Sequence, residues 1–198
     1  MQNNLWIAIC IICTYREAVY ALPGGAPTGA CTTMMPRHNN GANGFLASQS
    51  LASSPYTLMA SKRNYNSTEA ITVWVVDSRA SSDRGYRGLL LQARKVSSSA
   101  PVGTWMNVPA NTKLITCSVA NDAVTHSNTM VKNESSVYTW KAGGNHGNIE
   151  FVITTAQSRS TFWVQQKSGM LMHSSASVST STTFSLLFGI LCMAIFTM

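Results

Sequence analysis

Short apolar runs separated by turn residues fill the middle of the chain and constrain its fold most. Each run has the length of a strand, and Gly, Asn or Ser residues occupy the gaps. No long stretch shows a convincing 3.6-residue hydrophobic period. The sequence therefore predicts an all-β fold, an immunoglobulin-like antiparallel β-sandwich. The runs are 70–78, 88–96, 113–119, 135–142, 148–156 and 161–168, with 55–61 as a seventh candidate.

Alternation inside these runs predicts which side chains face the core, because successive residues of a strand point to opposite faces. The expected buried residues are Ile71, Val73 and Val75; Tyr138 and Trp140; Ile149, Phe151 and Ile153; and Ile115, Cys117 and Val119. Residues 22–50 are rich in Gly, Pro, Asn and Ser, so we expect an irregular segment pinned by Cys31. The GGNHG sequence at 143–147 is interpreted as a hairpin loop.

The N-terminal segment has the outline of a secretory signal. An apolar run, LWIAICIICTY, precedes Val19 and Ala21, two small residues spaced for cleavage. We therefore expect residues 1–21 to be a signal peptide that is cut after Ala21. A signal anchor is the alternative, but the run has only half of the about 20 residues that span a bilayer.

The chain ends in a second apolar segment, residues 184–198, which carries no charge. It is short for a bilayer and has no basic flank, so we expect a lipid-anchor signal. The small residues around Ser174 suit attachment of a glycolipid (GPI) anchor, and residues 169–183 form a Ser/Thr-rich stalk. The tail would then be removed, and the mature protein would be held on the outer leaflet. A transmembrane segment is the alternative.

Processing at both ends would leave two cysteines, Cys31 and Cys117. In an oxidising compartment they most simply form one disulfide, with a reactive thiol or a metal pair as alternatives. In the chain-entropy model, a disulfide closing such a loop contributes about 4.5 kcal/mol. Two sequons, at Asn66 and Asn133, are candidate N-glycosylation sites on surface loops.

The net charge of +7 comes from scattered Lys and Arg residues, without the basic block typical of a nucleic-acid tail. A basic surface of this kind attracts anionic lipids, glycans or bacterial walls. Arg84, Arg87 and Arg94 form a candidate polyanion contact, although a solvated sheet edge is the simpler interpretation of them.

No catalytic set or cofactor motif emerges from the residues. There is no GxSxG elbow, and the four histidines lack the spacing of a metal site. We expect no enzyme activity, no metal and no cofactor.

Several motifs in a fixed order resemble the reeler domain of reelin, spondin-type matrix proteins and ferric-chelate reductase-like proteins. They include RGYRGLLLQAR, PVGTW, KLITC, AVTHSN and IEFVITTA, and the resemblance covers residues 22–168. It implies a β-sandwich with one disulfide, here Cys31 to Cys117, and no catalytic set. Redox chemistry in the reductase-like relatives belongs to other domains, so it is not carried over.

The resemblance is greatest to small secreted defense proteins of insects. It implies an extracellular, non-enzymatic innate-defense protein whose partners are microbial surface polymers. The alternative is a surface adhesion module that binds glycosaminoglycans or extracellular proteins; no nucleic-acid partner is expected.

Overall fold

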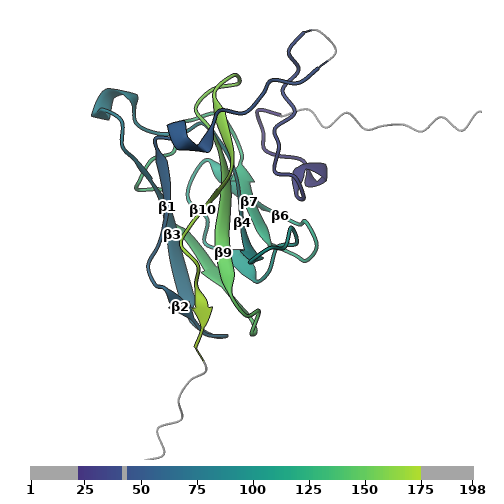
Figure 1. Cartoon of the computed structure of the whole chain (residues 1–198), viewed down its shortest axis with the longest axis vertical. Helices are drawn as coiled ribbons and strands as arrows, with labels where there is room; N and C mark the ends of the chain where they lie inside the picture. Colours follow the sequence, from purple (N-terminus) through teal and green to yellow (C-terminus); the bar gives the residue numbers. More distant parts are fainter. Residues whose placement is uncertain (1–21, 42–43, 175–198) are drawn as a thin grey trace, which may run out of the picture.

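The computed structural model describes residues 22–41 and 44–174, and in these residues the chain folds into β-strands without an α-helix (Figure 1). Two antiparallel sheets pack face to face, which confirms the predicted sandwich. Helical turns in the described residues are limited to three short 3-10 segments. These are η1 (Thr28–Ala30), η2 (Leu51–Ser53) and η3 (Ser81–Asp83).

The first sheet has four strands in the order β1-β3-β8-β5. They are β1 (Tyr56–Ala60), β3 (Ala70–Asp77), β8 (Tyr138–Lys141) and β5 (Thr104–Met106). Its longest strand, β3, buries Ile71, Val73 and Val75 and leaves the intervening residues partly accessible. The predicted alternation is therefore confirmed for this strand, whose β-branched residues fit a pleated, half-buried surface.

The second sheet has five strands in the order β10-β9-β4-β7-β6. They are β10 (Phe162–Lys167), β9 (Ile149–Ala156), β4 (Gly88–Lys95), β7 (Ala123–His126) and β6 (Thr112–Ile115). β4 and β9 pair along their whole length, from Gly88 opposite Ala156 to Lys95 opposite Ile149. These two strands form the centre of the sheet.

A short parallel pair, β2 (Asn64–Tyr65) with β11 (Met172–His173), lies at the lower end of the sandwich in Figure 1. It places Ser174 beside β2, where the Ser174 backbone N–H donates to the Tyr65 carbonyl at 2.8 Å. The described chain thus ends at the opposite end of the molecule from the turn between β9 and β10.

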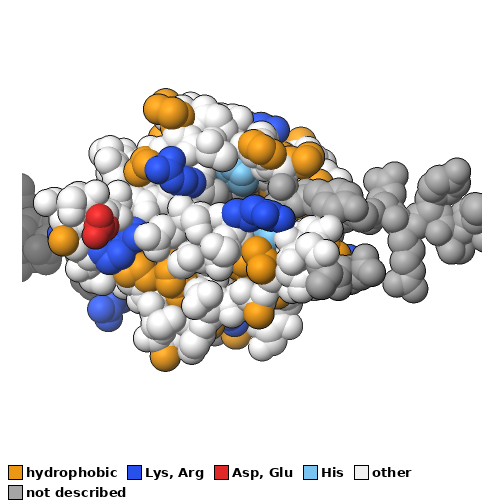
Figure 2. Space-filling model, turned by 90° about the horizontal axis from the view of Figure 1, so that it is seen from above, with side chains coloured by type: hydrophobic (Ala, Val, Ile, Leu, Met, Phe, Trp, Pro, Cys, Tyr) orange, Lys and Arg blue, Asp and Glu red, His pale blue; other side chains and the backbone are white. Residues whose placement is uncertain are grey.

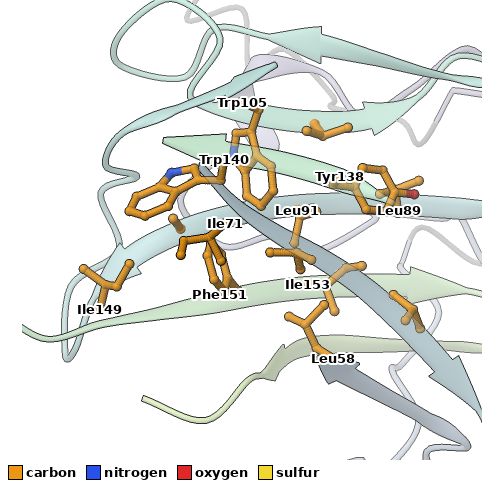
Figure 3. Close-up of a cluster of buried hydrophobic side chains, with 14 of the residues drawn as sticks. Leu58, Ile71, Leu89, Leu91, Trp105, Tyr138, Trp140, Ile149, Phe151 and Ile153 are labelled. Carbon is orange, nitrogen blue, oxygen red and sulfur yellow. The ribbon is translucent and has the colours of Figure 1, made fainter. Parts of the chain in front are cut away.

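The core between the sheets is built around large aromatic rings (Figure 3). The Phe151 ring lies 5.6 Å from the Trp105 ring and 5.4 Å from the Trp140 ring, centroid to centroid. The Trp140 pair is edge-to-face and the Trp105 pair is tilted. Edge-to-face pairs stabilise a core beyond simple area burial. The Trp140 indole N–H donates to the Val102 carbonyl at 3.0 Å, so this buried polar atom is satisfied.

The outer face of the second sheet is also buried, because the N-terminal segment crosses it. We call residues 22–40 the strap; its first part is the purple segment beside β7 and β6 in Figure 1. Ala30 and Met34 of the strap pack against Leu90, Ala123 and Val152 on β4, β7 and β9. Since both faces are covered, β4 is buried at every position from Leu89 to Arg94.

The strap pairs with no strand of the sheet, so side chains satisfy much of its backbone. The Cys31 carbonyl accepts from Arg94 Nη2 at 2.7 Å and from Gln92 Nε2 at 3.2 Å. The Thr154 hydroxyl donates to the Met34 carbonyl at 2.9 Å. The Cys31–Cys117 disulfide, which spans 86 residues, is the covalent fastening, and its prediction is confirmed.

Gly25 permits the close approach of the strap to β7. Its φ is +121°, and a Cβ built there would lie 2.5 Å from the His126 carbonyl oxygen. The adjacent Ala26 N–H donates to the Thr125 hydroxyl at 2.8 Å. A larger residue at position 25 would therefore push the strap off the sheet.

Three sequence predictions about local structure are wrong or incomplete. The run 113–119 ends as a strand at Ile115, because the Asp122 carboxylate accepts the N–H groups of residues 117–119 and turns the chain. Val119 is 57% exposed rather than buried. The 143–147 loop joins β8 in one sheet to β9 in the other, so it is not a hairpin loop. Strands β2, β5, β7 and β11 were not predicted; each has at most four residues.

We predict that Arg94→Met destabilises the protein by about 2–4 kcal/mol, because the buried strap carbonyls lose their charged donor. Burial lowers the pKa of Arg94, which the nearby Glu150 partly opposes, but the side chain still has three acceptors. Urea unfolding of the oxidised protein measures the change.

The matched control is Arg63→Met, which removes the same group from an exposed site. We expect the control to change the unfolding free energy by less than about 0.5 kcal/mol. Equal effects of the two substitutions would show that the contacts of Arg94 do not hold the strap.

Candidate functional site

A hollow of about 230 Å³ lies between the strap and the ends of β4, β7 and β9. We call it the strap groove. Its buried lining includes Ala30 and Met34 from the strap and Leu90 from β4, all members of the outer apolar cluster. Gly88 and Ala156, opposite each other at the strand ends, add only small groups. The groove is therefore mainly apolar inside.

Arginines from three separate segments line the same groove: Arg37 from the strap, Arg87 before β4 and Arg159 from the β9–β10 turn. All three are exposed. Figure 2, a view onto this end of the molecule, shows basic and histidine side chains among hydrophobic ones, with acidic side chains only toward its left edge.

Local neutral groups contact these arginines. Arg87 Nη1 donates to the Thr129 carbonyl at 3.2 Å, and Arg159 Nη2 donates to the Asn39 carbonyl at 2.5 Å. The Arg37 guanidinium lies 5.7 Å from the centre of the Phe45 ring. Within residues 22–41 and 44–174, no ion pair joins any of the three to a carboxylate. Their positive charge therefore remains available to an anion.

Two histidines also line the groove, and both have lowered pKa values. Burial is the main cause for the His126 pKa, and the charges of Lys132 and Lys113 act in the same direction. Burial likewise lowers the pKa of His38, with the positive charge of Arg159 adding to the effect. Both rings are therefore mainly neutral at pH 7, and arginine supplies the charge of the groove at that pH.

His126 also fastens the start of the strap. Its Nδ1 lies 3.2 Å from the Leu89 nitrogen, and its Nε2 lies 3.2 Å from the Leu22 carbonyl oxygen. A neutral ring with the proton on Nε2 accepts from the Leu89 N–H and donates to Leu22. The lowered pKa agrees with a neutral ring.

A buried lysine supports the loop beside Arg87. Lys132 Nζ donates to the carbonyls of Arg87, Asn128 and Met130 at 2.7–2.8 Å. Burial, with a contribution from the charge of Arg87, lowers the pKa of Lys132 to about 8. All three ammonium protons have acceptors, so this one side chain joins the Thr129 loop to the residue before β4.

The predicted three-arginine patch is not one surface, and this part of the prediction is wrong. Arg94 is 3% exposed and lies beneath the strap, where it bonds to backbone carbonyls. Arg84 is exposed after η3, and its Nε donates to the Arg79 carbonyl at 2.9 Å. Only Arg87 of the three lines the strap groove. Arg37 and Arg159 were missed, because they are far apart in the sequence and lie in segments without a pattern.

The other predicted sites lie away from the groove or outside the described residues. Asn66 and Asn133 each accept a hydrogen bond from the hydroxyl of their own sequon, Thr68 and Ser135 respectively. Ser174 is exposed at the end of the described chain. The predicted signal peptide, most of the stalk and the apolar tail fall outside the described residues.

A second hollow, of about 260 Å³, is a weaker candidate. It is lined by Ser97, Ser98 and Ser99 together with Glu150 and Lys167. The exposed Lys167 and the half-buried Glu150 neutralise each other, since Lys167 Nζ lies 2.7 Å from the Glu150 carboxylate. The third charged residue of this lining, Arg94, is buried and bonded to the strap carbonyls. An unpaired charge next to an apolar lining distinguishes the strap groove.

No cluster of three or more His, Cys, Asp or Glu side chains in residues 22–41 and 44–174 has the arrangement of a metal site. In the same residues, no helix has the length and hydrophobicity needed to cross a membrane.

Comparison with known proteins agrees with this architecture. "Putative ferric-chelate reductase 1" of Danio rerio is 35% identical over 170 residues, which are 83% of this chain. The match covers only 28% of that relative's own length. "Putative defense protein 3" of Antheraea mylitta is 33% identical, and the match covers 73% of this chain and 82% of the relative. The second relative is thus similar over most of both chains.

A solved structure shares the fold. The reeler domain of human F-spondin superimposes with a TM-score of 0.50 at 16% sequence identity, covering 61% of this chain and 90% of that domain. The Reeler domain family profile matches residues 29–179, from the strap to beyond β11. This chain therefore belongs to the reeler domain family.

Proposed function

We propose that this chain is an extracellular, non-enzymatic recognition protein of innate defense. Membership of the reeler family supports it, as do relatives named defense proteins that are similar over most of their length. The strap groove is the proposed binding site, and anionic molecules of microbial surfaces are the proposed ligands.

One observation carries the proposal: three exposed arginines without a carboxylate partner in the described residues surround one apolar groove. Guanidinium groups bind phosphates and carboxylates in a two-pronged geometry. The net charge of +7 adds long-range attraction to anionic surfaces. Both effects favour the anionic polymers and lipids of a microbial wall.

We predict that replacing Arg37, Arg87 and Arg159 together by Gln weakens binding to bacterial cells and to purified teichoic acid at least tenfold at low salt. Binding of the unchanged protein should also weaken as salt screens the charges. Sedimentation with cells, and a direct titration with teichoic acid, measure the effect.

The matched control replaces Arg63, Arg84 and Lys95 by Gln, which removes the same charge from exposed sites outside the groove. We expect it to reduce binding much less. Equal losses in the two variants would assign binding to net charge rather than to the groove. An unchanged protein that fails to bind at low salt would contradict the function itself.

The second candidate function is a surface adhesion module, and the position of Ser174 favours it. Ser174 lies at the end of the sandwich opposite the β9–β10 turn, which carries Arg159. A glycolipid anchor at Ser174 would therefore point the groove away from the membrane, toward a neighbouring cell. Glycosaminoglycans or extracellular proteins would then be the partners, and retention on heparin would support this alternative.

We predict that animal cells expressing the full chain hold it on their surface and release it after treatment with a phosphatidylinositol-specific phospholipase. Mass spectrometry of the released protein should find Leu22 as its first residue, Ser174 as its last, and glycans on Asn66 and Asn133. Protein found only in the medium would favour free secretion. Protein that stays on the membrane with its tail intact would contradict the anchor.

A further inference from the structure

We propose that the strap groove binds one acyl chain of a fatty-acid-like anionic amphiphile, with the acidic head group held by the arginines. The inference rests on the proposed function, because it assigns a ligand class to the same groove. It concerns the monomeric amphiphile rather than an intact bilayer.

The groove lining separates into an apolar part and a charged part. Ala30, Met34 and Leu90 are buried and apolar, whereas Arg37 and Arg159 are exposed. An amphiphile has the same division, with a hydrocarbon chain at one end and a charge at the other. Methionine suits a variable chain because its unbranched, polarizable side chain adapts to different shapes.

The volume favours a single chain over a larger ligand. At about 230 Å³, the groove is below the about 300–1,000 Å³ that is usual for sites that hold drug-sized molecules. The apolar interior has no room for a folded polymer or a two-chain lipid, although either can contact the exposed arginines at the edge of the groove. No Trp, Tyr or Phe among the described residues lines it, so this part of the chain offers no aromatic surface there on which a flat ring would stack.

The charge favours an acid over a base. Arg87 and Arg159 donate to neutral backbone carbonyls, and the two lining histidines are mainly neutral at pH 7. Within residues 22–41 and 44–174, no Asp or Glu belongs to the lining. A carboxylate or phosphate head would therefore gain charge-assisted hydrogen bonds, whereas a quaternary ammonium would be repelled.

To test this, the full chain is expressed in animal cells, and the processed protein is titrated with acetate, hexanoate, octanoate and decanoate below their micelle concentrations. Affinity should rise about fourfold for each methylene that enters the groove and then level off when the groove is full. Decyltrimethylammonium should bind at least tenfold more weakly than decanoate. Equal affinity for acetate and decanoate would overturn the proposal.

Substitutions locate the two ends of the ligand. Ala156→Leu fills the groove and should weaken decanoate at least tenfold, whereas Ala80→Leu, in an exposed loop, should have no effect. Arg159→Gln should weaken decanoate but not decanol, with Arg63→Gln as the charge control. Unchanged decanoate binding by Ala156→Leu would place the ligand elsewhere and contradict the proposal.

Methyl NMR of the unchanged protein tests the same assignment without any variant that could misfold. With 13C-labelled methionine methyl groups, decanoate should shift the Met34 and Met35 resonances and leave Met59, on β1, unmoved. Shifts only at Met59, or none, would contradict the assignment.

Two further arms separate this inference from the proposed function. Binding to teichoic acid without binding to decanoate would refute the acyl site and leave the proposed function intact. Binding to phosphatidylglycerol vesicles but not to decanoate would identify a membrane surface as the ligand, which also refutes it. Failure with all three probes would reject both proposals.

Discussion

The strap depends on hydrogen bonds between its own carbonyl groups and polar side chains on the outer face of β4. Arg94 and Gln92 point away from the main core, which would normally expose them, yet both are buried because the strap covers them. The strap shields Arg94 from water, and Arg94 in turn donates hydrogen bonds to strap carbonyls that have no strand partner. The disulfide then limits how far the two layers can separate in any partly unfolded state.

The groove follows from this arrangement. The strap crosses the sheet as an irregular segment, so it cannot pack evenly along the strands, and a hollow remains beside Gly88 and Ala156. Side chains at its edge come from the strap, from the start of β4 and from the β9–β10 turn. An exposed, charged perimeter therefore surrounds an apolar interior without any dedicated element. Loops on a rigid scaffold commonly carry binding sites for the same reason.

The sequence was sufficient for the inner half of the fold. Alternation in 70–78 and 148–156 identified the residues that face the core, since one side of each strand is continuously apolar. It was insufficient for the outer half. Arg94 looks like an exposed residue in any local pattern, and only the strap, some 60 residues earlier in the chain, buries it.

The groove itself could not be predicted. Arg37 and Arg159 are separated by most of the domain, and their segments meet through contacts such as the hydrogen bond from Arg159 to the Asn39 carbonyl. Short strands such as β5 and β7 were missed because three or four residues are too few to show a period. β6 ends early because the Asp122 carboxylate accepts backbone N–H groups that a longer strand would use for pairing. A hydrophobicity pattern does not show such hydrogen bonds.

Hydrogen exchange of the double variant Cys31→Ser, Cys117→Ser tests the central claim, that the strap is a separate layer held on a self-sufficient sandwich. We expect amides of the strap, including those of Ala26 and Met34, to exchange at least tenfold faster than in the disulfide-bonded protein. Amides of β3 and β8 should keep their protection. Strap amides that stay equally protected, or strands that lose protection together with the strap, would contradict the account.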